Sequence, residues 1–336
     1  MSETITSSFL GPLLKKNYAV AVSGEPELLH ERDGQRVFRV GLNDGTALTV
    51  RLCTVHRSEG RVLADTGALY FLNQRDFPAP HLRLTVAGER VFEWQQGCWG
   101  YAQDFIEGEN PSMDLETLSE VAHLLGRLHR MANSIENYPV EVGWLEEWMP
   151  AIHRAGSAAA SPDWKRLATE VAENLSSLPV KELEALPYGL LHADVHEGNL
   201  LRGVDGRLYM LDWEDAGLGQ AIFDLALVLG WNCVWQSSAV ILKPNQPPEL
   251  YDFDEEYCKT LLGNYQQERK LSDLERRMLG PAIRFVMGWF AARDMERELD
   301  EPGVSEGLAF TNWAIMRSIT PEWAATACGW SCARKA

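Results

Sequence analysis

The sequence of 336 residues has no uninterrupted apolar stretch of the roughly 18 residues that a membrane-spanning helix requires. Its longest candidate, Ala221–Trp235, is interrupted by Asp224. The first residues show neither the basic region nor the apolar region of a secretory signal peptide. We therefore expect a cytoplasmic protein that has no membrane partner.

Cysteine is sparse and scattered. The six cysteines include no Cys-x-x-Cys pair, so the usual sequence pattern of a structural zinc site is missing. In the expected cytoplasmic setting the thiols stay reduced.

Positive charge is in short supply. The chain has 31 Lys and Arg against 48 Asp and Glu, which gives a net charge of −17 at pH 7. Such a chain is repelled by phosphodiester backbones and by anionic membrane surfaces, so nucleic acid is not expected as a partner. The deficit is uneven, because residues 1–107 carry a net charge of −2 and residues 108–336 carry −15.

The two parts of the chain also differ in their residue pattern. Residues 1–103 contain short β-rich runs separated by turn signals, with one helical stretch at Ser58–Gln74. The expected strands are Tyr18–Val22, Arg36–Gly41, Ala47–Cys53, Leu82–Val86 and Arg90–Trp94. We predict a sheet-rich lobe over residues 1–103.

Residues 104–336 read as mainly helical, because apolar residues recur there at helical spacing. The expected helices are Leu115–Met131, Trp164–Leu178, Phe253–Gln267, Leu271–Glu298 and Glu306–Ile319. Gly280-Pro281 is expected to start a new helix inside the fourth of these. The prediction is thus an α+β chain with a sheet lobe followed by a helical lobe.

Three polar residues stand out from apolar flanks in residues 191–224, namely Asp194, Asn199 and Asp212. Phosphoryl transfer gives each of them a role. Mg²⁺ prefers hard oxygen ligands, which the Asp212 carboxylate and the Asn199 amide would offer. Asp194 would orient an attacking hydroxyl and accept its proton.

A metallohydrolase is the competing interpretation of the same segment. His192, Asp194 and His196 alternate, so a strand would place them on one face, where they could hold a transition metal together with Asp212. This alternative does not account for Asn199 or for the order of sheet and helices.

The segment 192–199, His-Ala-Asp-Val-His-Glu-Gly-Asn, followed by Leu-Asp-Trp-Glu at 211–214, resembles the catalytic and metal loops of the protein-kinase-like fold. Its specific form is most similar to the aminoglycoside phosphotransferase and choline kinase family, which commonly writes His-Gly-Asp at the start. Further likenesses lie at Phe77–Pro80, Asp104–Gly108, Leu125–His129 and Phe223–Ala226. The resemblance implies a two-lobed α+β kinase-like fold, ATP or GTP with Mg²⁺ as cofactors, and a hydroxyl acceptor.

The resemblance also implies roles for single residues. Asp194 would be the catalytic base, and Asn199 and Asp212 would bind the metal. His192 and Asp224 would be structural partners that brace the catalytic loop.

In the first lobe the resemblance implies a nucleotide site. Arg51 would hold the α- and β-phosphates, with Asp65 of the following helix as its partner and Glu59 as the fallback. Backbone groups of Asp104 and Ile106 would pair with the adenine edge.

The turn that should cover the phosphates is poor in glycine, with only Gly24 and Gly34 on offer. Acidic neighbours of these glycines would oppose phosphate binding. A catalytically weak binding module therefore stays open as an alternative.

The expected acceptor follows from the charge of the second lobe. The acidity of the second lobe favours a small cationic acceptor resembling an aminoglycoside, choline or another amino alcohol. Acids that could line its pocket are Asp252, Asp254, Glu255, Glu256, Glu296, Glu298, Asp300 and Glu301. A neutral metabolite, or Ser/Thr of a protein as in bacterial kinases of the same branch, is the alternative.

Overall fold

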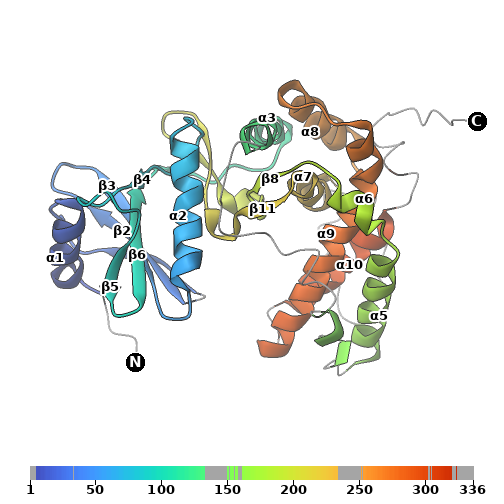
Figure 1. The fold of residues 1–336 in the computed structure, drawn as a ribbon, viewed down its shortest axis with the longest axis horizontal. Coiled ribbons are helices and arrows are strands. Elements are labelled where there is room, and N and C mark those ends of the chain that lie inside the picture. Colours follow the sequence, from blue (N-terminus) through green and yellow to red (C-terminus); the bar gives the residue numbers. More distant parts are fainter. Residues whose placement is uncertain are drawn as a thin grey trace, which may run out of the picture. The chain divides into compact units, whose positions relative to one another are not determined.

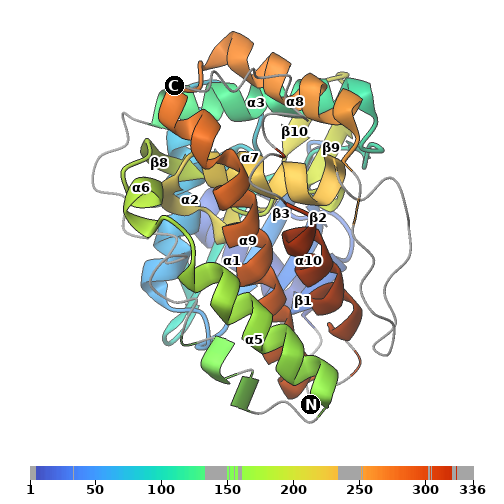
Figure 2. The same cartoon turned by 90° about the vertical axis from the view of Figure 1, so that its right-hand side faces the viewer.

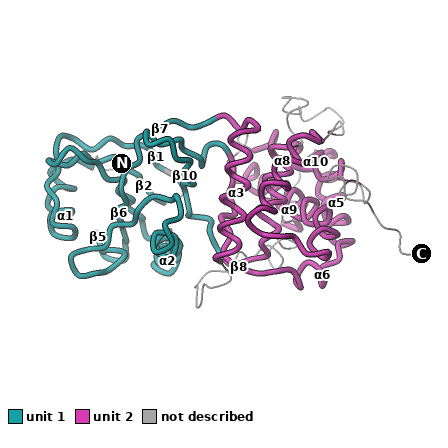
Figure 3. Tube along the Cα trace, turned by 90° about the horizontal axis from the view of Figure 1, so that it is seen from above, with its two compact units in different colours: residues 1–111, 135–140, 197–217 teal, residues 112–134, 141–196, 218–336 magenta. Residues whose placement is uncertain are grey.

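The computed structural model describes residues 5–32, 34–132, 150, 152–154, 156–157, 161–233, 251, 253–301, 303, 305–319 and 323 (Figure 1). The chain divides into two compact units (Figure 3). Unit 1 comprises Met1–Pro111, Ile135–Val140 and Glu197–Gly217, and unit 2 comprises Ser112–Ser134, Glu141–His196 and Leu218–Ala336. Neither unit is one continuous stretch of sequence, and the functional division after residue 103 stays a prediction.

An antiparallel sheet forms the centre of unit 1. Its strand order is β1-β2-β3-β6-β4, and β5 also pairs with β6. The strands are β1 (Glu27–Arg32), β2 (Gln35–Gly41), β3 (Ala47–Cys53), β4 (Leu82–Arg83), β5 (Phe92–Gln95) and β6 (Cys98–Asp104). The sheet confirms the fold prediction, although β1 and β6 both lie outside the predicted strands.

Two helices pack on this sheet, α1 (Ser7–Tyr18) and α2 (Glu59–Asn73) (Figure 1). Leu10 and Leu14 of α1 are fully buried in one core with alternate residues of β3. Only one helix was predicted in this lobe, and the strand expected at Tyr18–Val22 is wrong. Leu10 and Leu14 lie one helical turn apart, so a helical face covers the sheet there.

Unit 1 also contains a second, smaller sheet of order β10-β9-β7. Its elements are β7 (Gly108–Glu109), β9 (Leu200–Gly203) and β10 (Leu208–Met210), with short 3₁₀ helices η1 (Glu197–Asn199) and η2 (Trp213–Asp215) beside them. Asp205 and Gly206 make the hairpin turn between β9 and β10, and Gly206 has a φ of +79°. This hairpin carries Asn199 at one end and leads into Asp212 at the other.

Unit 2 is mainly helical, as predicted (Figure 2). Its elements are α3 (Leu115–Ala132), α5 (Pro162–Ser176), α6 (Val180–Glu184), α7 (Ile222–Val228), the π-helix η3 (Leu229–Cys233), α8 (Glu255–Glu268), α9 (Asp273–Asp300) and α10 (Glu306–Ser318). The strand β8 (Tyr188–Leu191) pairs with β11 (Gly217–Gln220). Among the described residues, no helix has both the length and the apolar content that crossing a membrane requires.

Helix α9 runs without a break past Pro281, so the new helix predicted there is wrong. A proline inside a helix costs about 3 kcal/mol or more, because it removes one backbone hydrogen bond and crowds the preceding turn. Here Leu279 and Ile283 are buried on either side of it, and Ser272 and Glu275 form a capping box at the helix start. Burial and capping outweigh the local cost of the proline.

Candidate active site

A buried carboxylate holds the loop that follows β8. Asp224 of α7 accepts hydrogen bonds from the backbone N–H of His192 (2.9 Å to Oδ2) and of Ala193 (2.9 Å to Oδ1). Its side chain is fully buried. The predicted partnership of His192 with Asp224 is therefore present, but it is made through the backbone of His192 rather than through the ring.

The loop leaves the Asp194 side chain partly exposed. The His192 ring is buried, and its Nδ1 accepts a hydrogen bond from the Asp194 N–H at 3.3 Å. The Asp194 side chain is 28% exposed, and its Oδ2 lies 3.5 Å from Nε2 of His196. Residues 192–196 form no strand, so the alternation on which the metallohydrolase alternative depends is absent.

The support behind Asp224 continues through unit 2. Nε2 of His129 lies 3.1 Å from Asp224 Oδ2, and its Nδ1 lies 2.9 Å from the Tyr265 hydroxyl. Arg269 donates to the same hydroxyl at 3.0 Å. Burial raises the pKa of Tyr265 well above its usual value, although Arg269 opposes the shift. The network joins the predicted catalytic loop to α3 and α8.

Unit 1 brings the two predicted metal ligands together. Asn199 is buried, and its backbone oxygen accepts a hydrogen bond from the N–H of Leu211 at 2.8 Å. Asp212 follows directly, in the left-handed region with a φ of 55°, and its side chain is 33% exposed. One amide oxygen and one carboxylate are hard donors of the kind that Mg²⁺ prefers, so these residues fit a magnesium ion.

Arg51 of β3 points into the same part of unit 1. Its Nη2 lies 2.8 Å from Asp212 Oδ1, and its Nη1 lies 3.3 Å from Glu214 Oε2. The side chain is only 11% exposed. Burial works against its charge, yet the pKa of Arg51 is raised overall, with the two carboxylates among the causes. Arg51 is therefore a fixed, buried positive charge.

Asp65, the expected partner of Arg51, is engaged elsewhere. Its Oδ2 lies 2.6 Å from Nη2 of Arg57, and its Oδ1 lies 3.3 Å from Nε of Arg61. Burial raises the pKa of Asp65 to about 6, while both arginines lower it. The fallback partner, Glu59, is exposed in the first turn of α2. A contact of Arg51 with Asp65 stays a prediction.

Two residues of this cluster escaped the sequence analysis. Gln35 of β2 is buried, donates from Nε2 to Glu214, and accepts from Arg51 Nη1 at 3.4 Å. Glu214 lies two residues after Asp212, within the quoted motif, which was the only signal for it. Gln35 offered none, because a single polar residue in a strand is commonplace.

The predicted hinge lies at the end of β6. The Asp104 N–H donates to the His81 carbonyl at 2.8 Å, and the Asp104 side chain pairs with Arg83. Any main-chain contact of Asp104 with a nucleotide base therefore falls to its carbonyl oxygen. Ile106 is half-buried between β6 and β7, and its pairing with adenine stays a prediction.

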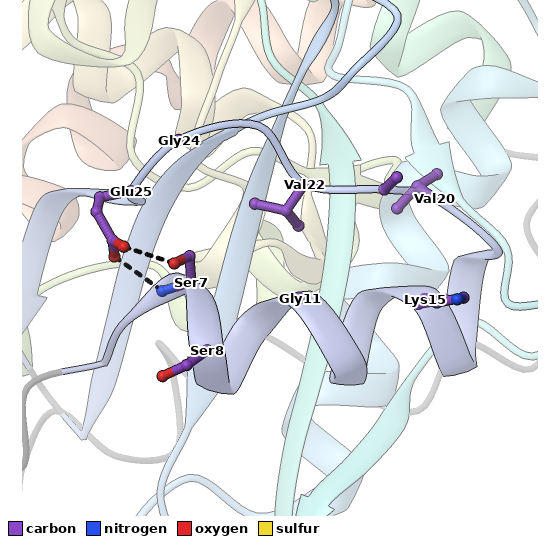
Figure 4. A pocket seen from close by; sticks show the side chains of 9 residues that line it. Ser7, Ser8, Gly11, Lys15, Val20, Val22, Gly24 and Glu25 are labelled. Carbon is purple, nitrogen blue, oxygen red and sulfur yellow. Dashed lines mark hydrogen bonds between the residues drawn. The ribbon is translucent and has the colours of Figure 1, made fainter.

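The two candidate glycines of the phosphate turn lie in different places. Gly34 precedes β2 in the β1–β2 hairpin with a φ of +74°, and a Cβ there would lie 2.9 Å from Thr54 Oγ1, so glycine suits the position. Gly24 precedes β1, beside a groove of about 540 Å³ along α1 (Figure 4). There the Glu25 carboxylate accepts from the N–H of Ser7 at 2.9 Å. Only Gly34 lies between the first two strands.

Trp231 and its partners lie close to the Asp194 loop in unit 2. The Trp231 ring centroid is 6.3 Å from that of His196. Its Nε1 donates to Asn312 Oδ1 at 3.0 Å, and Asn312 Nδ2 donates to Asp294 Oδ2 at 2.9 Å. Burial raises the pKa of Asp294 to about 7, although Asn312 and the charge of Arg293 lower it.

Several of the acids named for the acceptor pocket have local partners. Asp254 caps α8, Glu255 pairs with Lys259, and Glu296 pairs with Arg154. Glu298 accepts from the N–H groups of Ser305 and Glu306. Asp252 lies outside the described residues. These contacts supply structural roles that need no acceptor.

A family model described as the phosphotransferase enzyme family matches residues 28–270, more than half of the chain. The chain belongs to this family. The predicted family resemblance is therefore confirmed, and the matched residues include Asp194, Asn199 and Asp212.

Two curated relatives of this chain carry kinase names. A thiamine kinase from Shigella dysenteriae is 28% identical over 155 residues, 45% of this chain and 46% of the relative. A homoserine kinase from Nitrobacter winogradskyi is 25% identical over 190 residues, 55% of this chain and 54% of the relative. The chain thus spans about half the length of these relatives.

Solved structures confirm the kinase-like fold of the chain. An amicoumacin kinase in complex with AMP-PNP, Ca²⁺ and Ami has a TM-score of 0.67 at 17% identity and covers 94% of both chains. A microcompartment-associated aminopropanol kinase has a TM-score of 0.66 at 15% identity, covering 96% of this chain and 98% of its own. At such identities the likeness shows the fold alone.

Proposed function

We propose that this protein is an ATP- and Mg²⁺-dependent phosphotransferase that moves the γ-phosphoryl group onto the hydroxyl of a small molecule. The observation that carries the proposal is the 2.8 Å contact of Arg51 with Asp212, beside Asn199. One buried guanidinium and two oxygen donors are what a metal-loaded triphosphate needs. When bound, the metal neutralises charge on the phosphates.

Asp194 acts on the acceptor in this proposal. The acceptor oxygen bonds to the γ-phosphorus, the bond from that phosphorus to the β–γ bridging oxygen breaks, and ADP leaves. The acceptor proton passes to the Asp194 carboxylate, whose side chain is 28% exposed. The backbone N–H of Asp194 donates to the His192 ring, which helps to fix the loop. No covalent intermediate on the protein is required.

The names of the relatives support a small acceptor, because a thiamine kinase and a homoserine kinase are among them. We further propose that the acceptor is cationic. The net charge of −15 over residues 108–336 favours it, and so does the exposed part of Trp231 near Asp194, since an indole face attracts cations. A cytoplasmic location stays a prediction.

A thermal-shift screen tests the proposal. ATP, GTP and ADP are each added with Mg²⁺ or with a chelator, and amines, sugars and amino alcohols follow. We expect a nucleotide to raise Tm only when Mg²⁺ is present, and one acceptor to stimulate ADP release. Nucleotide binding without any transfer would favour a binding module, and transfer to a protein Ser/Thr would favour a protein kinase.

The charge of the acceptor is tested by salt. Salt screens the attraction between a cationic acceptor and the acidic side chains of residues 108–336. The acceptor KM should therefore rise steeply between low and physiological ionic strength. An acceptor KM that does not change with salt rejects the cationic acceptor but leaves phosphoryl transfer intact.

A further inference from the structure

The cluster around Arg51 gives this arginine two acidic partners with different exposure. Asp212 is 33% exposed at its side chain, whereas Glu214 is 22% exposed. Glu214 is also held by the Gln35 side chain from the neighbouring strand β2. The partner that contacts solvent more is the one to which we assign a metal.

Gln35 connects the two charged residues. Val37 lies directly opposite Arg51 in the β2–β3 pair, so Gln35, two residues away, projects from the same face. Its amide donates to Glu214 while its carbonyl oxygen accepts from Arg51. The amide therefore fixes Arg51 and Glu214 against each other from one rigid strand.

The first turn of helix α2 and Arg57, which precedes this helix, hold the backbone of Glu214. Arg57 and Arg61 both bind Asp65, and both donate to the backbone oxygen of Glu214. The helix acid thus anchors the turn that carries Glu214. Helix α2 is thus linked to Arg51 through Glu214, whose backbone contacts Arg61 and whose side chain contacts Arg51.

Resting on the proposed function, we propose that Glu214 is the positioning residue of Arg51. When the Asp212 carboxylate binds the metal, Arg51 loses its closest partner. Glu214 and Gln35 then keep the guanidinium directed at the phosphates. Helix α2 and Asp65 serve this arrangement by holding the backbone at residue 214.

The test measures binding of a fluorescent ATP analogue to Glu214→Gln, with Mg²⁺ and with a chelator. The positioning role predicts that the analogue binds about tenfold more weakly under both conditions, because a displaced Arg51 contacts the phosphates poorly. If Glu214 acted on the nucleotide only through its charge, Glu214→Gln would bind the analogue more tightly, since removing a negative charge near a polyphosphate strengthens binding. Unchanged or tighter binding in chelator overturns the proposal.

A double-mutant cycle separates positioning from metal binding. If Glu214 acts through Arg51, Glu214→Gln adds little to the loss already caused by Arg51→Lys. If Glu214 is instead a metal ligand, Glu214→Gln weakens nucleotide binding only when Mg²⁺ is present, and this loss adds fully to that of Arg51→Lys. That result also overturns the proposal.

Two further variants keep the test sound. Gln35→Met removes only the bridging amide, so a smaller loss of about threefold is expected even if Glu214→Gln folds poorly. Glu170→Gln removes a carboxylate of helix α5 that pairs with Arg166 and Arg317 and has no assigned role in nucleotide binding, and it serves as the matched control for lost charge. A Gln35→Met variant that binds like the wild type contradicts the bridge. Absence of nucleotide binding by the wild-type protein would instead reject the proposed function.

Discussion

Nε2 of His129 lies 3.1 Å from Oδ2 of Asp224, and neither side chain is exposed to solvent. The same carboxylate accepts two backbone N–H groups from the loop that leads to Asp194. One buried aspartate thus joins helix α3, helix α7 and the predicted catalytic loop.

Replacing Asp224 with Ala leaves three buried donors without an acceptor. We expect a loss of about 3–5 kcal/mol in the free energy of unfolding, measured by urea denaturation, because orphaned buried polar groups are costly. Asp224→Asn keeps one acceptor oxygen and should lose less. Loss of under about 1 kcal/mol for the alanine variant would show that the loop does not depend on this carboxylate.

Much of the fold was predictable because its signals are local. Apolar residues at helical spacing predicted both α3 and α10. The errors arose where tertiary contacts decide. The sequence analysis missed helix α1, whose buried apolar face consists of only two residues, Leu10 and Leu14. It was also wrong at Pro281, which helix α9 accommodates because the neighbouring residues are buried.

The candidate site also contains residues that the sequence predicts and residues that only the fold reveals. The residues of one short motif were predicted, since their chemistry and spacing stand in the sequence. Gln35 and Arg57 could not be predicted, because their partner Glu214 lies more than a hundred residues away along the chain. Only folding places strand β2 and the turn at η2 together.

Ala193 adopts the left-handed region, with a φ of 65°. This region costs an L-residue with a Cβ about 1–2 kcal/mol, whereas glycine enters it freely. Ala193→Gly should therefore be neutral or stabilise the protein by up to about 1 kcal/mol in urea denaturation. The matched variant Ala122→Gly, in the interior of helix α3, should destabilise by about 1 kcal/mol. Equal losses in both variants would contradict strain at Ala193.

Asp194→Asn tests the proposed base. Asparagine keeps the size of the side chain but accepts no proton, so we expect kcat to fall on the order of 10³-fold. The Kd for ATP with Mg²⁺ should change little, since Asp194 is assigned no contact with the phosphates. Transfer at the wild-type rate would reject the assignment.

Asp212 needs a substitution that respects its backbone. Its φ of 55° is tolerated by Asn better than by Ala, so Asp212→Asn removes the charge with little added strain. We expect both variants to lose the part of nucleotide affinity that depends on Mg²⁺, measured as the ratio of Kd in chelator to Kd in Mg²⁺. Asp212→Ala should in addition lower Tm. A ratio equal to that of the wild type would count against Asp212 as a metal ligand.

The buried carboxyl of Asp294 makes stability depend on pH. Burial raises its pKa to about 7, from 3.8 in the unfolded chain, so between these values the folded state holds a proton that the unfolded state has released. Stability therefore falls as pH rises through this window and levels off above pH 7.

Asp294→Asn removes this titration while keeping a side chain of the same size. From pH 5 to pH 8 the wild type should lose roughly 1–3 kcal/mol more unfolding free energy than the variant does. Asp65, whose pKa is raised to about 6, acts in the same direction but is present in both proteins and cancels. Parallel profiles of stability against pH would show that Asp294 is ionised in the folded protein, with the charge of Arg293 outweighing burial.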